Sequence, residues 1–283
     1  MERALGWRPT RFRHATEDRG SSATAARWIV ANDARSAFVK IGANQRTADW
    51  IRMEQRNYAA LSGWFLPQVL GFDDDGTRPA LALEDLSGAA WPPPWTDTRV
   101  AGVLEALAAV AATPPPEHLE EISIDWDAGW RTVEADPAPF LALGLCSANW
   151  LERCLPRLVQ AADAAIQSGS SLVHLDVRSD NLCFRDGRAI LIDWNHAGVG
   201  NRALDVAFWL PSLHAEGGPP PQQVLPDAGE LAALVAGFFC GHAGVGPLPE
   251  APHVRPLQLR QARVALPWAA RELGLEVPRA GSA

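Results

Sequence analysis

The sequence predicts an α+β protein of two lobes: a small lobe of mainly antiparallel strands with one helix, and a larger, mainly helical lobe. β-type runs around short turns dominate the first 86 residues, and helical patterns dominate the rest. A chain of 283 residues is long enough for two modest domains. A stiff, proline-rich connector at 91–95 follows the change of pattern. We therefore expect an amino-terminal lobe of residues 1–86 and a carboxy-terminal lobe of residues 87–283.

The small lobe is expected to contain two strand pairs with a helix between them. Asn32-Asp33 and the segment 73–76 are typical turn sequences between β-rich runs. Apolar residues at Ile51, Tyr58 and Leu61 among charged residues indicate an amphipathic helix. The predicted elements are strands 27–30 and 36–41, a helix over 47–61, and strands 69–72 and 80–83.

The large lobe is expected to be helical apart from one hairpin. Asp186-Gly187 is a strong two-residue turn signal, which predicts a β-hairpin over 182–192. The predicted helices cover 98–112, 128–134, 149–167 and most of 202–275.

Composition and charge exclude several classes of protein. A net charge of −8 argues against nucleic-acid binding. No apolar run approaches the roughly 20 residues of a membrane span, and residues 1–20 carry no apolar signal segment. The four cysteines lack paired spacing and indicate reduced thiols, with a Cys146–Cys154 disulfide as the less favoured alternative. These observations predict a cytoplasmic protein that binds neither nucleic acid nor membrane.

Lysine occurs once in the whole sequence. The chain has 25 basic residues, and Lys40 is the only one that is not arginine. Where arginine has replaced lysine throughout, a surviving lysine indicates a position that needs a compact ammonium group. Chance survival at a neutral position is the alternative. We interpret Lys40 as functional.

Asp176, Asn181 and Asp193 surround the predicted hairpin. Asn181 precedes it and Asp193 follows it, so the turn brings these two residues face to face. Oxygen ligands without sulfur suit Mg²⁺ held jointly with a phosphate. Asp176 would then lie beside the metal, where it can accept the proton of an incoming hydroxyl. Each residue alone could be structural, but their combination in this order favours phosphoryl transfer.

The pattern His174-x-Asp176-x4-Asn181, followed by Asp193-Trp194, resembles the aminoglycoside phosphotransferase and choline kinase family, which has the bilobal protein-kinase-like fold. The resemblance spans about residues 14–275. It implies a small-molecule kinase that uses Mg²⁺ and transfers the γ-phosphoryl group of ATP or GTP to an acceptor hydroxyl. It also implies that Asp176 is catalytic and that Asn181 and Asp193 hold the metal.

The resemblance assigns further residues. Residues 81–86 are similar to the strand that leads into the hinge, where backbone groups hold the base. Arg178 would contact the transferred phosphate, with a solvated side chain as the alternative. The implied nucleotide-binding residues are Lys40, Glu54, Ser21, Ser22, Glu84 and Leu86, and the residues that support the catalytic loop are His174 and Asp205.

Two features depart from the family pattern. Leu175 stands where the family usually has glycine, which puts the backbone of the catalytic loop in doubt. The expected phosphate-covering loop is poor in glycine and has only Gly20 in place. The G-x-x-x-x-G-K-[ST] motif is absent, so the chain is not a P-loop kinase.

An uneven distribution of charge predicts a cationic acceptor. Residues 87–180 contain 13 acidic residues and 5 arginines. Within the acidic segment 117–136, Asp125, Trp126 and Asp127 are the candidate acceptor residues, with Trp130 nearby. Carboxylates attract a positive ligand, and aromatic faces hold ammonium groups or sugar rings. A solvated acidic surface is the alternative. An antibiotic is one candidate acceptor.

Three other functions remain open. A protein kinase of the same fold is disfavoured because Asp193-Trp194-Asn195 replaces Asp-Phe-Gly and no Ala-Pro-Glu segment follows. A catalytically silent binding module conflicts with the presence of every candidate catalytic residue. A metal-dependent hydrolase built on His174, Asp176 and Asp193 would need more metal ligands than the sequence offers.

Overall fold

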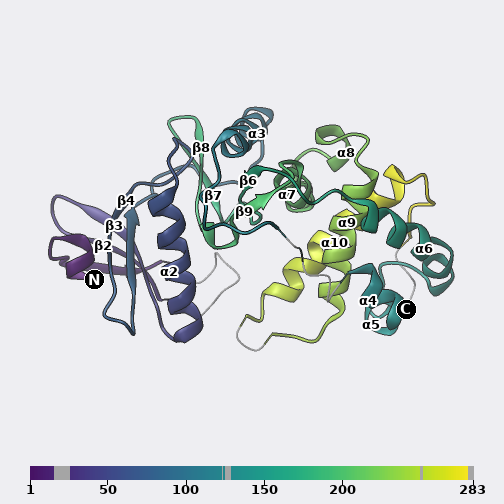
Figure 1. Ribbon diagram of the computed structural model, residues 1–283, viewed down its shortest axis with the longest axis horizontal. Helices are drawn as coiled ribbons and strands as arrows, with labels where there is room; N and C mark the ends of the chain where they lie inside the picture. Colours follow the sequence, from purple (N-terminus) through teal and green to yellow (C-terminus); the bar gives the residue numbers. More distant parts are fainter. Residues whose placement is uncertain (16–25, 123, 125–128, 249–250, 280–283) are drawn as a thin grey trace.

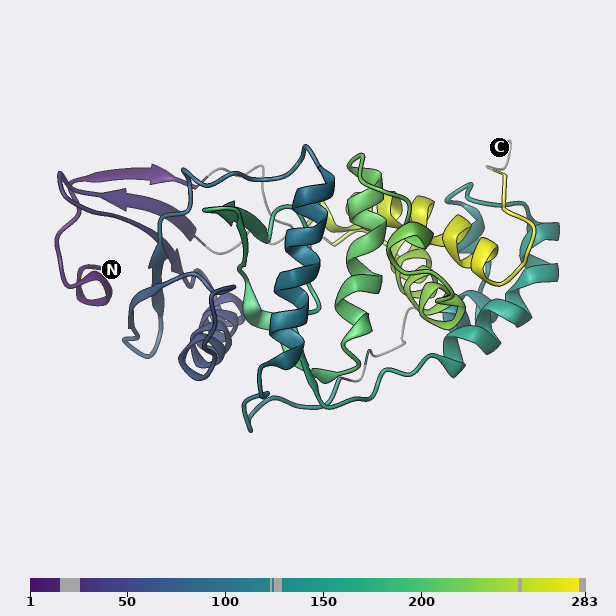
Figure 2. The same ribbon diagram turned by 90° about the horizontal axis from the view of Figure 1, so that it is seen from above.

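The computed structural model describes residues 1–15, 26–122, 124, 129–248 and 251–279, and all structural statements refer to these residues. Two lobes lie side by side along the long axis, with the two termini at opposite ends (Figures 1 and 2). The small lobe carries the strands and one long helix, and the large lobe carries most of the helices. The predicted α+β, two-lobed fold is therefore confirmed.

A five-stranded antiparallel sheet in the order β1-β2-β3-β5-β4 forms the small lobe. Alternation along β3 points Lys40 and Phe38 to the face toward the large lobe, while Val39 and Ala37 join a small core with α1 on the other face. The elements of this lobe are α1 (Glu2–Leu5), β1 (Arg11–His14), β2 (Ala26–Ala31), β3 (Ser36–Ile41), α2 (Gln45–Ala60), β4 (Val69–Asp73) and β5 (Ala80–Glu84).

The long helix α2 starts at a capping box. The Asn44 side chain accepts from the Thr47 backbone N–H, and the Thr47 hydroxyl accepts from the Asn44 backbone N–H. Its buried face includes Ile51, Glu54 and Tyr58. The predicted helix is confirmed, with a start two residues earlier, and the four predicted strands are each present.

The large lobe surrounds one extended hydrophobic core. Seen from above, α3 stands between the small lobe and the remaining helices (Figure 2). Its helices are α3 (Asp97–Ala112), α4 (Trp130–Ala135), α5 (Ala138–Leu141), α6 (Ala148–Ala164), α7 (Ala203–Ala215), α8 (Pro221–Val224), α9 (Gly229–Gly244) and α10 (Val254–Glu272). Its short strands are β6 (Ser171–Val173), β7 (Leu182–Arg185), β8 (Arg188–Leu191) and β9 (Gly198–Gly200), with a 3₁₀ turn at Trp194–His196.

The predicted hairpin is present as β7 and β8, with Asp186 and Gly187 between the strands at positive φ. One predicted boundary is wrong: α6 ends at Ala164 rather than at residue 167. The chain leaves the helix because Asn201 donates a side-chain hydrogen bond to the Ile166 carbonyl and a backbone one to the Gln167 carbonyl. Within the described ranges, no helix is long and apolar enough to cross a membrane.

Candidate active site

Lys40 lies at the centre of a buried cluster of charged groups between the lobes. Its ammonium group is 2.8 Å and 2.7 Å from the two carboxylate oxygens of Glu54 on α2, and 3.0 Å from Oδ1 of Asp193 in the large lobe. Lys40 is only 5% exposed and Glu54 is fully buried. Burial disfavours the charged ammonium, but the carboxylates of Asp193 and Glu54 outweigh it and raise the pKa of Lys40. Lys40 is therefore a fixed positive charge.

Asp205 on α7 anchors the backbone of the loop before the hairpin by accepting hydrogen bonds from it. The backbone N–H of His174 lies 3.0 Å and 2.9 Å from its two carboxylate oxygens, and the N–H of Leu175 lies 2.7 Å from Oδ1. Burial raises the pKa of Asp205 to about 6, although these N–H groups favour its anion. Asp205 thus ties α7 to the start of the loop.

His174 connects this loop to the residues after the hairpin. Burial lowers its pKa to about 4, so its imidazole is neutral near pH 7. Nε2 lies 3.0 Å from the Ile192 carbonyl, and Nδ1 lies 3.2 Å from the Asp176 backbone N–H, which makes Nε2 the donor and Nδ1 the acceptor. Its ring also packs edge-on against Trp194, with centroids 4.6 Å apart. Both ring nitrogens of His174 are therefore engaged by backbone groups, and the side chain links the loop to Ile192.

Leu175 resolves the doubt about the missing glycine. Its φ is +61°, in the left-handed region that glycine adopts readily and leucine rarely does. The loop thus keeps a glycine-like backbone despite the leucine. The hydrogen bond from Leu175 to Asp205 compensates part of the strain, which costs on the order of 1–3 kcal/mol for such a residue.

Asp176 accepts hydrogen bonds from two later residues of the motif, Asn181 and Arg178. Asn181 Nδ2 donates to Asp176 Oδ2 at 2.7 Å and to its backbone carbonyl at 2.9 Å. Arg178 pairs with Oδ1 of Asp176 and with Asp180. Burial raises the pKa of Asp176, even though Arg178 acts in the opposite direction. A carboxylate with a raised pKa accepts a hydroxyl proton more readily than an exposed aspartate.

Asn181 pairs with Ile192, the residue before Asp193, through the hydrogen bond from the Ile192 N–H to the Asn181 carbonyl, and Asn181 and Asp193 both line one cavity. With Nδ2 of Asn181 donating to Asp176, its Oδ1 is the atom left to face a cation. Burial disfavours the carboxylate of Asp193, yet Lys40 and Arg27 hold its pKa well below the ordinary value. Among the described residues, no cluster of three or more acidic, histidine or cysteine side chains could hold a metal alone. This donor set fits Mg²⁺ that arrives with a phosphate and does not fit a closed protein site.

Two cavities meet at this cluster. The donor cavity, about 320 Å³, is lined by Lys40, Asn181 and the hinge residue Leu86. The acceptor cavity, about 760 Å³, is lined by Asp176 and Arg178. Asp193 and Arg27 line both. The two cavities therefore share Asp193 and Arg27, with Lys40 lining one cavity and Asp176 lining the other.

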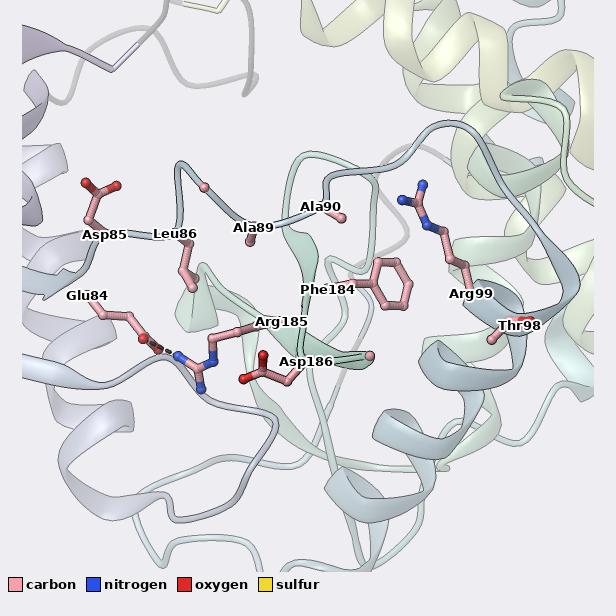
Figure 3. A pocket seen from close by; sticks show the side chains of 12 residues that line it. Glu84, Asp85, Leu86, Ala89, Ala90, Thr98, Arg99, Phe184, Arg185 and Asp186 are labelled. Atoms are coloured by element: carbon pink, nitrogen blue, oxygen red, sulfur yellow. Dashed lines mark hydrogen bonds and ion pairs between the residues drawn. The ribbon is translucent and has the colours of Figure 1, made fainter.

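The hinge forms one wall of the donor cavity. The apolar lining of this cavity comes from both lobes, with Phe38 and Leu86 on one side of the chain division and Ile192 on the other, so the base of a nucleotide would meet apolar side chains there. The side chain of Glu84 pairs with Arg185 and accepts from the Gln68 N–H at 2.8 Å (Figure 3). The Glu84 side chain therefore links the end of β5 to the hairpin.

Some predicted site residues lie outside the described residues, namely Ser21, Ser22, Asp125, Trp126 and Asp127. Other members of the acidic segment lie apart: Glu120 and Glu121 line the acceptor cavity, whereas Trp130 and Glu134 do not. Trp130 is buried in the core and donates to the Ala233 carbonyl, and Glu134 pairs with Arg131 on the surface. The proposed role of Trp130 beside an acceptor is thus wrong, because its side chain fills the space between α4 and α9.

Sequence reasoning missed Arg27. Its place opposite Lys40 in the register of β2 and β3 puts both side chains on the same face of the sheet. Arg27 Nη2 lies 3.9 Å from Oδ2 of Asp193. The predicted hairpin over 27–41 contained this signal, since cross-strand partners share a face. Asn57 was also missed: it donates to the Trp194 carbonyl at 2.6 Å and lies 2.9 Å from Nε2 of His118.

Comparison with known proteins agrees with this geometry. A family model described as "Phosphotransferase enzyme family" matches residues 16–238, which include the polar and charged residues around the junction of the two cavities: Arg27, Lys40, Glu54, Asp176, Arg178, Asn181 and Asp193. The chain belongs to this family. No curated protein matches the sequence.

Solved structures of family members share the fold at low sequence identity. A thermostable mutant of aminoglycoside phosphotransferase APH(4)-Ia, in its apo form, is 16% identical with a TM-score of 0.56, over 96% of this chain and 95% of that one. Spectinomycin phosphotransferase APH(9)-Ia, in complex with ADP and spectinomycin, is 12% identical with a TM-score of 0.57, over 93% and 91%. A putative fructosamine-3-kinase from Haemophilus somnus 129PT is 14% identical with a TM-score of 0.52, over 96% and 94%. The predicted protein-kinase-like fold and family are confirmed.

Proposed function

We propose that this phosphotransferase is a small-molecule kinase that transfers the γ-phosphoryl group of ATP or GTP to an acceptor hydroxyl. The observation that carries the proposal is the meeting of two cavities at Asp193 and Arg27, with Lys40 on the donor side and Asp176 on the acceptor side. Phosphoryl transfer needs fixed charges around the phosphates and a positioned nucleophile, and little covalent work by the protein. The buried cluster around Lys40 supplies the fixed charges, and Asp176 would position the acceptor hydroxyl as the nucleophile.

In the proposed reaction, the acceptor hydroxyl gives its proton to the Asp176 carboxylate as its oxygen forms a bond to the γ-phosphorus. The bond from that phosphorus to the β–γ bridging oxygen breaks, and the nucleoside diphosphate leaves with the electron pair. Lys40 contacts the remaining phosphates, and Arg178 contacts the transferred group. Asn181 and Asp193 would hold Mg²⁺, which neutralises phosphate charge when bound.

The proposal divides the work between residues 1–86, which bind the nucleotide, and residues 87–283, which carry catalysis and acceptor binding. Ser21 and Ser22 would cover the phosphates, and the backbone of Glu84 to Leu86 would hold the base. A cationic acceptor near Asp125–Asp127 is supported by Glu120 and Glu121, which line the acceptor cavity. An antibiotic is a candidate, because two similar structures carry hygromycin B or spectinomycin. The proposed location is the cytoplasm, which the four free, buried cysteines support.

The test is nucleotide-dependent modification of a panel of hydroxylated antibiotics and metabolites. The protein is incubated with each compound, Mg²⁺ and ATP or GTP, and products are examined for a mass increase of one phosphate group. Hydrolysis of the compounds without nucleotide would favour a metal-dependent hydrolase instead. Transfer to protein side chains, with none to small molecules, would favour a protein kinase.

Mg²⁺ should bind with the nucleotide and not before it. Asn181 and Asp193 offer one carboxamide and one carboxylate, too few oxygen ligands for a dehydrated Mg²⁺ ion. Calorimetry should therefore detect tight Mg²⁺ binding only when nucleotide is present, and Asp193→Asn should weaken that binding about tenfold or more. Tight binding of Mg²⁺ to the nucleotide-free protein would contradict this assignment.

Arg27→Ala should lower kcat/KM for the nucleotide about tenfold or more, because it removes a fixed charge from the junction of the two cavities. Arg35→Ala is the matched control, since Arg35 lies on the same hairpin but is exposed. Steady-state kinetics with varied nucleotide measures both. Equal values of kcat/KM for the two variants would show that Arg27 takes no part in transfer.

A further inference from the structure

Part of the lining of the acceptor cavity is apolar. Its hydrophobic wall consists of side chains from the catalytic loop, α7, α9 and α10: Leu175, Phe208, Phe238, Phe239, Val254 and Leu257. The rings form a continuous surface, with the centroids of Phe208 and Phe238 5.3 Å apart and those of Phe238 and His242 4.3 Å apart. Phe208 and Phe238 are only partly buried by the protein itself. An apolar surface of this kind inside a binding cavity is suited to an apolar part of a ligand.

Leu175 extends this wall to the reacting centre. Its neighbour in the chain is Asp176, and both line the acceptor cavity. A glycine would adopt the φ of +61° without strain, whereas leucine adopts it at a cost in free energy. The strained residue therefore contributes an apolar surface next to the group that accepts the hydroxyl proton, which is where a specificity contact has the greatest effect.

The glutamates of the cavity lie beside this wall, since Ile122, which follows Glu120 and Glu121, packs in one cluster with Leu175 and Phe208. Among the described lining residues, the carboxylates are Asp176 and Asp193, which are paired with Arg178 and Lys40, and the exposed Glu120 and Glu121. The backbone around these glutamates is fixed on β9, because Ile122 N–H donates to Val199 at 2.8 Å and Val199 N–H donates to Glu120 at 2.9 Å. The two neighbouring glutamates, Glu120 and Glu121, suit a ligand with one positive group better than a ligand with several.

We propose that the acceptor is an amphipathic alcohol. Its hydroxyl lies at Asp176, an apolar, ring-bearing body packs on the hydrophobic wall, and a single cationic group lies at Glu120 and Glu121. This inference rests on the proposed kinase function and names the chemical class of its acceptor. It separates this chain from a kinase whose acceptor is a polycationic sugar, which would leave the wall without a partner.

The test compares two amines with the same hydroxyl and amino groups, ethanolamine and 2-amino-1-phenylethanol, which differ by one ring. Calorimetric titrations are made with and without ADP and Mg²⁺. The ring should strengthen binding at least about tenfold, because it removes apolar surface from water. Phe238→Ser should abolish this preference, and Leu175→Gly, which relieves the positive φ, should reduce it several-fold. Ile166→Ser, a change of an exposed residue after α6, should leave it unchanged.

Equal binding of the two amines, no binding of either, or tighter binding of hygromycin B than of 2-amino-1-phenylethanol would overturn the inference. Retention of the ring preference in both wall variants would also overturn it. Failure of the kinase proposal is seen separately, as a lack of ADP binding and of nucleotide-dependent transfer, since the amine titrations are also made without nucleotide.

Discussion

Asp176→Asn should lower the rate of phosphoryl transfer by about 10²–10⁴-fold, because it removes the group that we propose accepts the hydroxyl proton. The substitution preserves size, but the asparagine amide has one acceptor oxygen where Asp176 accepts from both Asn181 and Arg178, so only one of these two contacts is kept. Nucleotide binding should persist, since Lys40 and Asp193 are unchanged. Single-turnover transfer measures the rate, and titration with ADP and Mg²⁺ measures nucleotide affinity.

The matched control is Asp163→Asn, which makes the same chemical change on the surface of α6, where Asp163 pairs with Arg131. This variant should transfer at the normal rate. Near-normal turnover in Asp176→Asn, together with normal turnover in the control, would remove Asp176 from the chemistry and direct attention to the metal-bound side of the cluster.

Lys40→Arg should lower kcat/KM by about 10²-fold despite keeping the charge. The ammonium group fits between three carboxylate oxygens at 2.7–3.0 Å and is almost fully buried. A planar guanidinium is larger and cannot occupy that point, and overpacking a buried position costs about 1–3 kcal/mol. Thermal unfolding separates this loss of stability from the loss of catalysis.

Arg52→Lys provides the comparison for this exchange. Arg52 on α2 pairs with Asp49 and Asp74 at a more exposed position, where ion pairs contribute about 0–1 kcal/mol. It should change neither kinetics nor unfolding temperature appreciably. If Lys40→Arg behaves in the same way, then the survival of a single lysine in this sequence was accidental.

The predicted strands and hairpins follow from local rules. The alternation in residues 36–41 and the Asp186-Gly187 turn specify their elements through the residues themselves, and both are present. The end of α6 could not be predicted in this way. Local sequence continues the helix to residue 167, but hydrogen bonds from Asn201, far along the chain, take the carbonyls of Ile166 and Gln167.

The order of Lys40, Asp176, Asn181 and Asp193 along the chain indicated phosphoryl transfer. Few reactions use a lysine, oxygen ligands for a metal and a nearby base together. Only the tertiary structure decided how these groups are used. Packing of the lobes places Arg27 at the junction of two cavities. Packing of α4 against α9 buries Trp130 in the core. Packing of α7, α9 and α10 builds an apolar wall in the cavity that Asp176 lines, from residues that are distant in sequence. No local pattern contains such a surface, since it exists only where separate helices meet.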